Sequence, residues 1–273
     1  MGKNRDYIYP YEDIVEGKIL NSSFCGEFEI VCVRNYQEVK IRFLTTGKEY
    51  WKTKGQLRRG YVADPYFPTV YGKGYLGEGR YKTKINGVPY KPAYVWKHML
   101  GRVYNEDNDR FKRYTSYLEG VCEEWLNMQN FCAWYEDQTK HLGDSKGYHL
   151  DKDLKLGKVY SPENCVIIPQ ELNIALVCKV SSSGKYLTGV TSSRGEGFRA
   201  RVKRSVGEGN KLVYSKAFTT QEEAHEEYAK MKKTVLMSLA KKLLNEGKIS
   251  EDIYALVENL DIKALIEHKN PTK

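Results

Sequence analysis

One short segment of the chain carries side chains that could together hydrolyse a phosphodiester bond. Asp151, Lys152 and Asp153 stand together at the end of a predicted strand. Asn164 follows on a second short strand, and Asn173 lies at the start of a helix. Hydrolysis needs a group that activates water and a cation that neutralises charge on the phosphate. Carboxylate, amide and water oxygens are the ligands that Mg²⁺ or Mn²⁺ prefers, so the segment predicts a metal-dependent nuclease site.

The same segment, HLDKDLKLGKVYSPENCVIIPQELN, resembles the HNH endonucleases, particularly the phage-type members with a ββα-metal motif. In that family an Asp-His pair closes the first strand, an Asn lies on the second, and an Asn or His on the helix completes the metal site. Asn164 and Asn173 stand nine residues apart. The resemblance implies that Asp151 and Asn173 hold the metal and that Asn164 orients the base or its loop. Lys152 then stands where the family has its general-base histidine.

This departure leaves several alternatives for the base. An unperturbed lysine is protonated near neutral pH and cannot accept a proton, whereas a neutral imidazole can. Desolvation or a neighbouring cation could lower the pKa of Lys152. His149, on the same strand face as Asp151, could be the base, or Asp153 could act as a second carboxylate. In a fourth alternative the protein keeps the scaffold and binds DNA without cutting it.

Residues 185–235 resemble a second family, the Apetala-two/ERF DNA-binding domain, which also occurs fused to phage HNH enzymes. The matching stretches are KYLTGVTSSRGEGFRARV and AFTTQEEAHEEYAKMKK. In that family a three-stranded sheet lies in the major groove and a helix packs behind it. Phe198, Ala200 and Val202 alternate with bases, which independently predicts a strand with one apolar and one basic face. By position the DNA-facing residues are Arg194, Arg199, Arg201, Lys203 and Arg204.

The first part of the chain is predicted to be β-rich. Apolar residues alternate over 28–33 and 39–43, and the polar stretch Asn35–Glu38 between them predicts a hairpin. Residues 51–79 are rich in Gly, Pro, Tyr and bases and are predicted to form a surface arm or loop. Interleaved aromatic and basic side chains favour contact with nucleic acid. The bases concerned are Lys52, Lys54, Arg58 and Arg59.

Helical periodicity and capping signals place the remaining elements. Apolar stripes predict helices over 93–103 and 121–135, and capping residues Thr220 and Ser250 predict two more near the end of the chain. His225 and His268 are expected to be exposed and without a role. The predicted organisation is a β-rich region (1–92), an HNH-like core (93–180), an Apetala-two-like domain (181–245) and a helical tail (246–273).

Composition agrees with a polyanionic partner. The chain has 44 Lys and Arg against 35 Asp and Glu, and 22 Tyr against 8 Phe. Tyrosine offers a stacking face and a hydroxyl that reaches phosphate. The six cysteines form no C-x-x-C pair, so reduced thiols are expected in place of zinc ligands. No apolar run is long enough to cross a bilayer, which favours a cytosolic protein.

These observations predict a multi-domain α+β protein that is a DNA endonuclease of the HNH homing type, with Mg²⁺ or Mn²⁺ as cofactor. The expected partner is double-stranded DNA, with a homodimer as one route to paired cleavage. The expected location is the cytoplasm, which is the host's if the protein is phage-encoded. Two alternatives stay open: a catalytically inactive DNA-binding or host-interfering phage protein, and an RNA-binding module.

Overall fold

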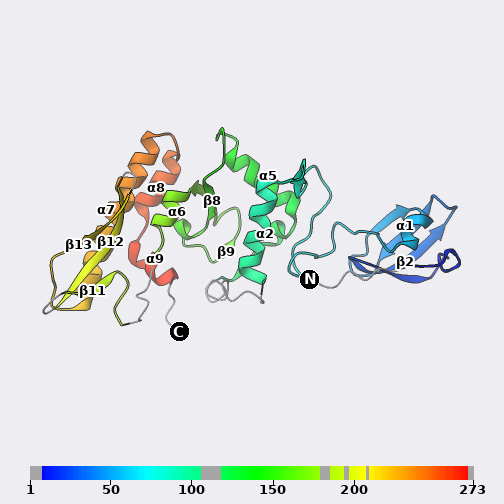
Figure 1. The fold of residues 1–273 in the computed structure, drawn as a ribbon, viewed down its shortest axis with the longest axis horizontal. Coiled ribbons are helices and arrows are strands. Elements are labelled where there is room, and N and C mark those ends of the chain that lie inside the picture. Colours follow the sequence, from blue (N-terminus) through cyan, green and yellow to red (C-terminus); the bar gives the residue numbers. More distant parts are fainter. Residues whose placement is uncertain (1–7, 106–117, 179–184, 194–196, 207–208, 270–273) are drawn as a thin grey trace. The chain divides into compact units, whose positions relative to one another are not determined.

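The computed structural model is mixed α+β, as predicted (Figure 1). It describes residues 8–105, 118–178, 185–193, 197–206 and 209–269. The chain divides into two compact units. One comprises the described residues of Met1–Phe111 and Cys122–Trp134, and the other those of Lys112–Val121 and Tyr135–Lys273. Among the described residues, no helix is both long and apolar enough to cross a membrane.

The first unit contains an antiparallel four-stranded sheet in sequential order, drawn in blue in Figure 1. Its strands are β1 (Ile19–Ser22), β2 (Gly26–Val33), β3 (Val39–Phe43) and β4 (Glu49–Lys52). The pairing of β2 with β3 confirms the predicted hairpin. The inner face of the sheet carries fully buried side chains from both of these strands, among them Phe28, Ile30, Ile41 and Phe43.

The prediction of a surface loop from residue 51 onward is wrong for its first part. Lys52 belongs to β4, and a short helix, α1 (Lys54–Arg58), follows it. The Thr53 side chain accepts from the Gln56 backbone while Gln56 bonds back to Thr53, so a capping box starts this helix. Leu57 is fully buried, which ties α1 to the core of the sheet.

The rest of the first unit is a hairpin and helices. The hairpin strands are β5 (Lys84–Ile85) and β6 (Val88–Pro89), and α2 (Lys91–Tyr104) realises the first predicted helical stripe. The second stripe is interrupted, because Asn127 separates α4 (Glu123–Leu126) from α5 (Met128–Thr139) and residue 121 lies on a strand. The Trp96 indole donates to the Trp125 carbonyl at 2.7 Å, which fixes α2 against α4.

The second unit begins with the predicted sequence of two strands and a helix. β8 (Tyr148–Asp151) pairs antiparallel with β10 (Val166–Pro169), and α6 (Gln170–Ala175) follows β10 directly. The register places Asp151 opposite Val166. A 3-10 turn, η2 (Asp153–Lys155), comes after β8, and β7 (Gly120–Val121) pairs in parallel with β9 (Val159–Tyr160).

A three-stranded sheet and three helices complete the second unit. The sheet has the order β11-β12-β13, formed by β11 (Val190–Ser192), β12 (Phe198–Val206) and β13 (Gly209–Tyr214). The helices are α7 (Gln221–Asn245), which begins with the predicted Thr220 capping box, α8 (Glu251–Asn259), which Ser250 caps, and α9 (Ile262–Lys269).

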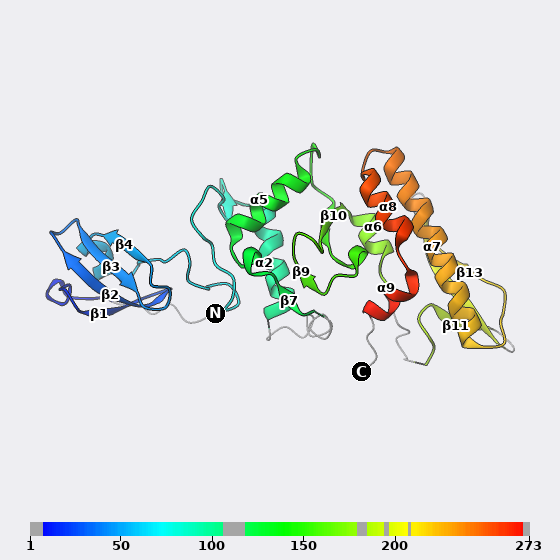
Figure 2. The same ribbon diagram turned by 180° about the vertical axis from the view of Figure 1, so that it is seen from behind.

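A single hydrophobic core joins these parts of the second unit. It contains side chains of β10 and α6, of the three-stranded sheet, and of α7, α8 and α9. Figure 2 shows α6, α7 and α8 side by side. Segment 246–273, predicted as a tail, therefore supplies two core helices, and Leu265 of α9 is fully buried. The described residues of 181–245 and 246–273 thus share one unit with residues 118–121 and 135–178, whereas residues 93–105 and 122–134 of the predicted segment 93–180 belong to the first unit.

Candidate functional site

The end of β8 brings His149 and Asn173 together. His149 lies on β8 and is exposed, while Asn173 lies on α6, which starts where β10 ends. The Asn173 carboxamide nitrogen lies 3.3 Å from His149 Nδ1. Rotating the carboxamide by 180° places its oxygen against Nδ1–H, and a neutral ring then keeps its lone pair on Nε2. In that arrangement His149 can accept a proton from water.

Asp151 lies one side-chain repeat along the same strand face as His149. The residue is 4% exposed, and its Oδ1 accepts a hydrogen bond from the Leu154 backbone N–H at 2.8 Å. This bond closes the turn at η2. Burial, reinforced by the negative charge of Asp153, raises the pKa of Asp151 to about 6. The carboxylate is therefore ionised at neutral pH, but at a cost.

The Lys152 side chain is buried within the second unit. It is 4% exposed, and Nζ lies 2.6 Å from Asp153 Oδ1 and 3.5 Å from His268 Nε2. The other oxygen of Asp153 lies 2.8 Å from Lys269 Nζ, and its Oδ1 also lies 3.3 Å from His268 Nε2. We call these four residues, Lys152, Asp153, His268 and Lys269, the Asp153 cluster.

The Asp153 cluster holds its carboxylate ionised. Burial acts to raise the pKa of Asp153, but the hydrogen bond with His268 and the charges of Lys269 and Lys152 outweigh it. The pKa of Asp153 is consequently well below its usual range. The predicted site residues thus separate into two groups: His149 meets Asn173, whereas Lys152 and Asp153 belong to a buried ion network.

Asn164 lies in the turn before β10, and its placement on a strand was wrong. Its side-chain nitrogen donates to the Val159 carbonyl at 3.1 Å, and its backbone N–H donates to the Ser161 carbonyl at 3.2 Å. A Cβ at Gly157 would lie 2.7 Å from the Asn164 Cβ, so the loop packs tightly on this residue. Asn164 therefore shapes the loop between β8 and β10.

Sequence reasoning missed His268 and Lys269, which reach Asp153 from the last described helix. His268 was expected to be exposed, yet its side chain is only 6% exposed. The available signal was the apolar spacing of Ile262, Leu265 and Ile266, which predicts a buried helix face. His268 and Lys269 follow at three and four residues after Leu265 and extend that face.

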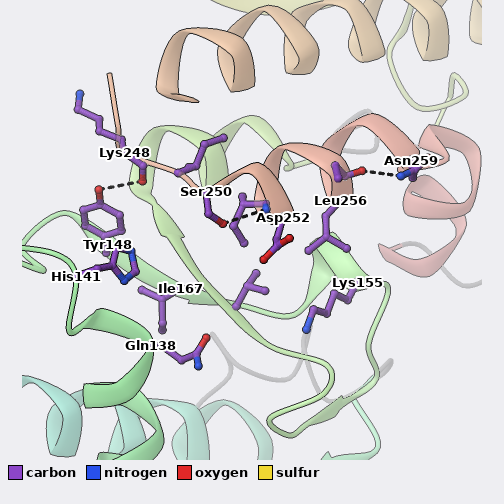
Figure 3. A pocket seen from close by; sticks show the side chains of 14 residues that line it. Gln138, His141, Tyr148, Lys155, Ile167, Lys248, Ser250, Asp252, Leu256 and Asn259 are labelled. Atoms are coloured by element: carbon purple, nitrogen blue, oxygen red, sulfur yellow. Dashed lines mark hydrogen bonds between the residues drawn. The ribbon is translucent and has the colours of Figure 1, made fainter. Parts of the chain in front are cut away.

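The donor chemistry fits a hard divalent cation only in part. The described residues contain no group of three or more His, Cys, Asp or Glu side chains arranged to hold a metal ion. A cation here would depend on the Asp151 carboxylate, the Asn173 amide oxygen and water, all of which are oxygen ligands that Mg²⁺ accepts. The nearby cavity of about 470 Å³ is a separate feature, lined by residues of β8, β10 and α8 such as Tyr148, Ile167 and Leu256 (Figure 3). The predicted site residues do not line it.

The three-stranded sheet presents a basic face. Arg199, Arg201 and Lys203 alternate along β12 and are exposed, whereas Ala200 and Val202 between them are buried in the core shared with α7. Successive residues on one strand face are roughly 6.6 Å apart. Within the described part of the chain, no carboxylate forms a salt bridge with these three bases.

Two of the predicted DNA contacts on this domain lie beyond what the structure describes. Arg194 is outside the described residues, and for Arg204 only the backbone is described, opposite Lys211. On β13 the exposed side chains of Leu212 and Tyr214 stand opposite Lys203 and Arg201, so they share the basic face.

The first unit carries the other predicted contacts. Arg58 and Arg59 on and after α1 are exposed, and Lys52 and Lys54 are half-buried. The Arg58 guanidinium lies 5.2 Å from the Tyr11 ring centroid, and Lys52 Nζ lies 5.2 Å from that of Tyr50. Bases and aromatic rings therefore do interleave on this surface, a composition that suits stacking and phosphate contact.

No protein-family model, curated protein or solved structure matches the chain.

Proposed function

We propose that this protein is a DNA endonuclease of the HNH homing type, which hydrolyses duplex DNA with Mg²⁺ or Mn²⁺ in the cytoplasm. One observation carries the proposal. A strand–strand–helix unit with His149 against Asn173 shares a hydrophobic core with a sheet that exposes a row of basic side chains, none of which forms a salt bridge with a described carboxylate. The residue proposed to activate water and the surface proposed to hold DNA thus belong to one compact unit.

Duplex binding is assigned to the outer face of β12. Arg199, Arg201 and Lys203 lie on the same side of an open sheet, and a two- or three-stranded ribbon can enter the major groove. Arginine can address either phosphates or guanine edges, while lysine contributes mainly charge. Lys52, Lys54, Arg58 and Arg59 would add phosphate contacts from the first unit.

For the chemistry, the roles differ from those of the family at one position. His149 takes the proton of the attacking water, because Lys152 is engaged by Asp153 and His268. Asp151 and Asn173 would hold the divalent cation, which when bound stabilises charge on the phosphate. Asn164 keeps the loop between the strands in place through its bond to Val159.

The competing function is DNA binding without cleavage. It is favoured by one specific observation: Lys152 stands at the family's base position in a buried ion network, while Asp151 is 4% exposed with one oxygen already bonded to Leu154. In this version the charges at the end of β8 have become structural, and the basic face of β12 carries the whole function.

A plasmid nicking assay with and without Mg²⁺ or Mn²⁺ tests the proposal. We expect wild type to nick supercoiled DNA and His149→Ala and Asp151→Asn to lose that activity, while Asp137→Asn, at an exposed aspartate, keeps it. Among the described residues, Asp137 pairs with Lys140 and Gln138 at the surface. Intact plasmid and intact cognate phage DNA at every metal tested would refute the enzyme.

Binding assays then separate the remaining alternatives. Gel shifts with duplex DNA across a salt series should give a steep salt dependence, since phosphate contacts release counterions. Retained duplex binding without cleavage would leave the inactive DNA-binding protein. Tighter binding to RNA than to duplex DNA at equal salt would favour the RNA-binding module. Linear products in addition to nicked circles would indicate paired action by a homodimer.

A further inference from the structure

A short hairpin in the first unit presents two apolar side chains at its tip. Ile85 on β5 pairs directly with Val88 on β6 across the turn Asn86–Gly87. Asn86 and Gly87 have φ values of 50° and 79°, which is the type I′ geometry that Asn-Gly favours and that suits a tight hairpin. Because direct cross-strand partners point to the same face, Ile85 and Val88 form one apolar pair.

This pair is among the more exposed apolar groups of the described chain. Ile85 is 52% exposed and Val88 is 66% exposed. A two-stranded hairpin is marginal in water unless something supports it. Two adjoining exposed apolar side chains on a projecting turn are a feature that can mark contact with a partner.

The base of the hairpin is held firmly, which makes the tip a fixed projection. The Tyr90 backbone donates to the Thr83 carbonyl at 3.0 Å, next to the strand pair. Gln129 of α5 both accepts from the Tyr81 N–H and donates to the Tyr81 carbonyl, each at 3.0 Å. The rings of Tyr81 and Tyr90 stack with centroids 6.1 Å apart.

The surrounding charge selects the kind of partner. Residues 79–92 contain no aspartate or glutamate and four basic residues, Arg80, Lys82, Lys84 and Lys91. A partner that is anionic outside and apolar inside fits this arrangement. Duplex DNA has that construction, with phosphates flanking a stack of bases, and apolar wedges enter it through the minor groove.

We propose that the β5–β6 hairpin inserts Ile85 and Val88 at a base step of duplex DNA and kinks the duplex. This rests on the proposed function, since it specifies how the same DNA substrate is deformed. Unstacking is least costly at pyrimidine–purine steps such as TA, so these steps are the expected insertion points. The basic side chains beside the Ile85–Val88 pair, including Lys84 on the opposite face of the hairpin, would contact the flanking phosphates.

The test uses the full-length protein and a roughly 30-base-pair duplex of mixed sequence with several TA steps, because a kink is measurable on that length. Dyes at the two ends report bending by energy transfer, and 2-aminopurine at the TA steps reports unstacking. EDTA prevents cleavage. Wild type should raise both signals. The Ile85→Ser/Val88→Ser variant should raise neither, and it should bind about tenfold more weakly.

Two variants serve as matched controls. Ile19 belongs to the same unit and is also 52% exposed, so Ile19→Ser makes the same chemical change away from the hairpin and should keep both signals. Lys84→Ala should weaken binding while the saturated complex stays kinked, because it removes a phosphate contact and leaves the apolar pair. Thermal unfolding should be unchanged in the double variant, since both side chains are exposed.

Each contrary outcome is distinct. If the double variant bends the duplex as much as wild type at saturation, the hairpin proposal fails while DNA binding stands. If wild type binds no duplex at any salt concentration, the proposed function and the hairpin proposal both fail. If the pair is required for binding vesicles of mixed phosphatidylserine and phosphatidylcholine but not for binding DNA, the hairpin addresses membrane surfaces and the proposal is overturned.

Discussion

Asp151 and Asp153 are two residues apart at the end of β8, yet their surroundings are opposite. Asp151 is buried with one hydrogen bond from the Leu154 backbone, whereas Asp153 is held by Lys152, His268 and Lys269. Burial raises the pKa of Asp151. The pKa of Asp153 is lowered, because the hydrogen bond with His268 and the charges of Lys269 and Lys152 outweigh burial. The difference teaches that burial alone does not decide the role of a carboxylate; the number of cationic partners does.

The comparison has a functional meaning. Asp151 is a carboxylate short of positive charge, which is the condition in which a divalent cation binds with the largest gain. Asp153 already has its positive charge from the protein, so a cation would add little there. Asp151, the predicted metal ligand, therefore has less compensating positive charge than Asp153, the predicted second carboxylate.

Removing the Asp153 carboxylate should have the largest effect on the free energy of unfolding. Asp153→Ala leaves Lys152, His268 and Lys269 close together without their anion, and it should lower the free energy of unfolding by about 3–5 kcal/mol. Urea denaturation at neutral pH measures this. Asp137→Ala, at an exposed surface pair, should change it by less than about 0.5 kcal/mol and is the control. A loss for Asp153→Ala no greater than that of the control would contradict the cluster.

Neutralising the Asp151 carboxylate should change the free energy of unfolding in the opposite direction. Since the pKa of Asp151 is raised from 3.8 to about 6, the folded state binds more protons than the unfolded state between these values. Stability from this group therefore falls as pH rises through that window, and the cost is complete above it. Asp151→Asn removes that cost and should stabilise the metal-free protein by roughly 2–3 kcal/mol at pH 8.

The pH dependence provides the check on that prediction. The advantage of Asp151→Asn in urea denaturation should shrink below pH 6 and vanish near pH 4, where wild-type Asp151 is itself neutral. The same variant should lose nicking activity, so stability and activity change in opposite directions. Equal stabilities of the two proteins at pH 8 would remove the distinction between Asp151 and Asp153.

Removing His268, one partner of the Asp153 carboxylate, should have an intermediate effect on the free energy of unfolding. His268→Leu deletes a hydrogen bond to Asp153 but leaves both lysines, so we expect a loss of about 1–1.5 kcal/mol in the free energy of unfolding. The appropriate control is His141→Leu, at an exposed histidine outside the cluster. A loss as large as that of Asp153→Ala would mean that the histidine, and not the two lysines, keeps Asp153 ionised.

The prediction with the smallest effect tests whether basic residues with and without a carboxylate partner contribute differently to DNA binding. Arg201→Ala should reduce the slope of log binding constant against log salt by about one and should weaken duplex binding by about 1 kcal/mol. Lys269→Ala, which removes a base of the Asp153 cluster, should leave the slope unchanged. Gel shifts over a salt series measure both, and equal slopes for the two variants would remove the assignment of DNA contact to β12.

Much of the fold could be predicted because it depends on local signals. Alternation placed β2, β3 and β12, and capping residues placed α7 and α8. The β8–β10–α6 unit was also expected, although Asn164 lies in a turn, since Ser161 and Asn164 close a local bend before the strand starts. These features depend on neighbours within a few residues, which is the range that periodicity and capping describe.

The site could be predicted only in part, because it depends on contacts between distant residues. His268 and Lys269 lie more than a hundred positions from Asp153 and reach it only because α9 joins the core. Without that contact, Lys152 looks like a displaced catalytic base. The burial of Lys152 in the Asp153 cluster therefore could not be predicted without tertiary structure, whereas the adjacency of His149 and Asn173 follows from the strand–strand–helix order itself.

The common core of the second unit limits how such a protein can change. When a linker joins a DNA-binding domain to a catalytic domain, recombination can replace one DNA-binding domain with another. The distance between the bound sequence and the cut then varies. Here α7 packs on both β12 and α6. For the proposed endonuclease, a change of target would therefore require substitutions on the outer face of β12, and the cut would lie at a constant distance from the bound sequence.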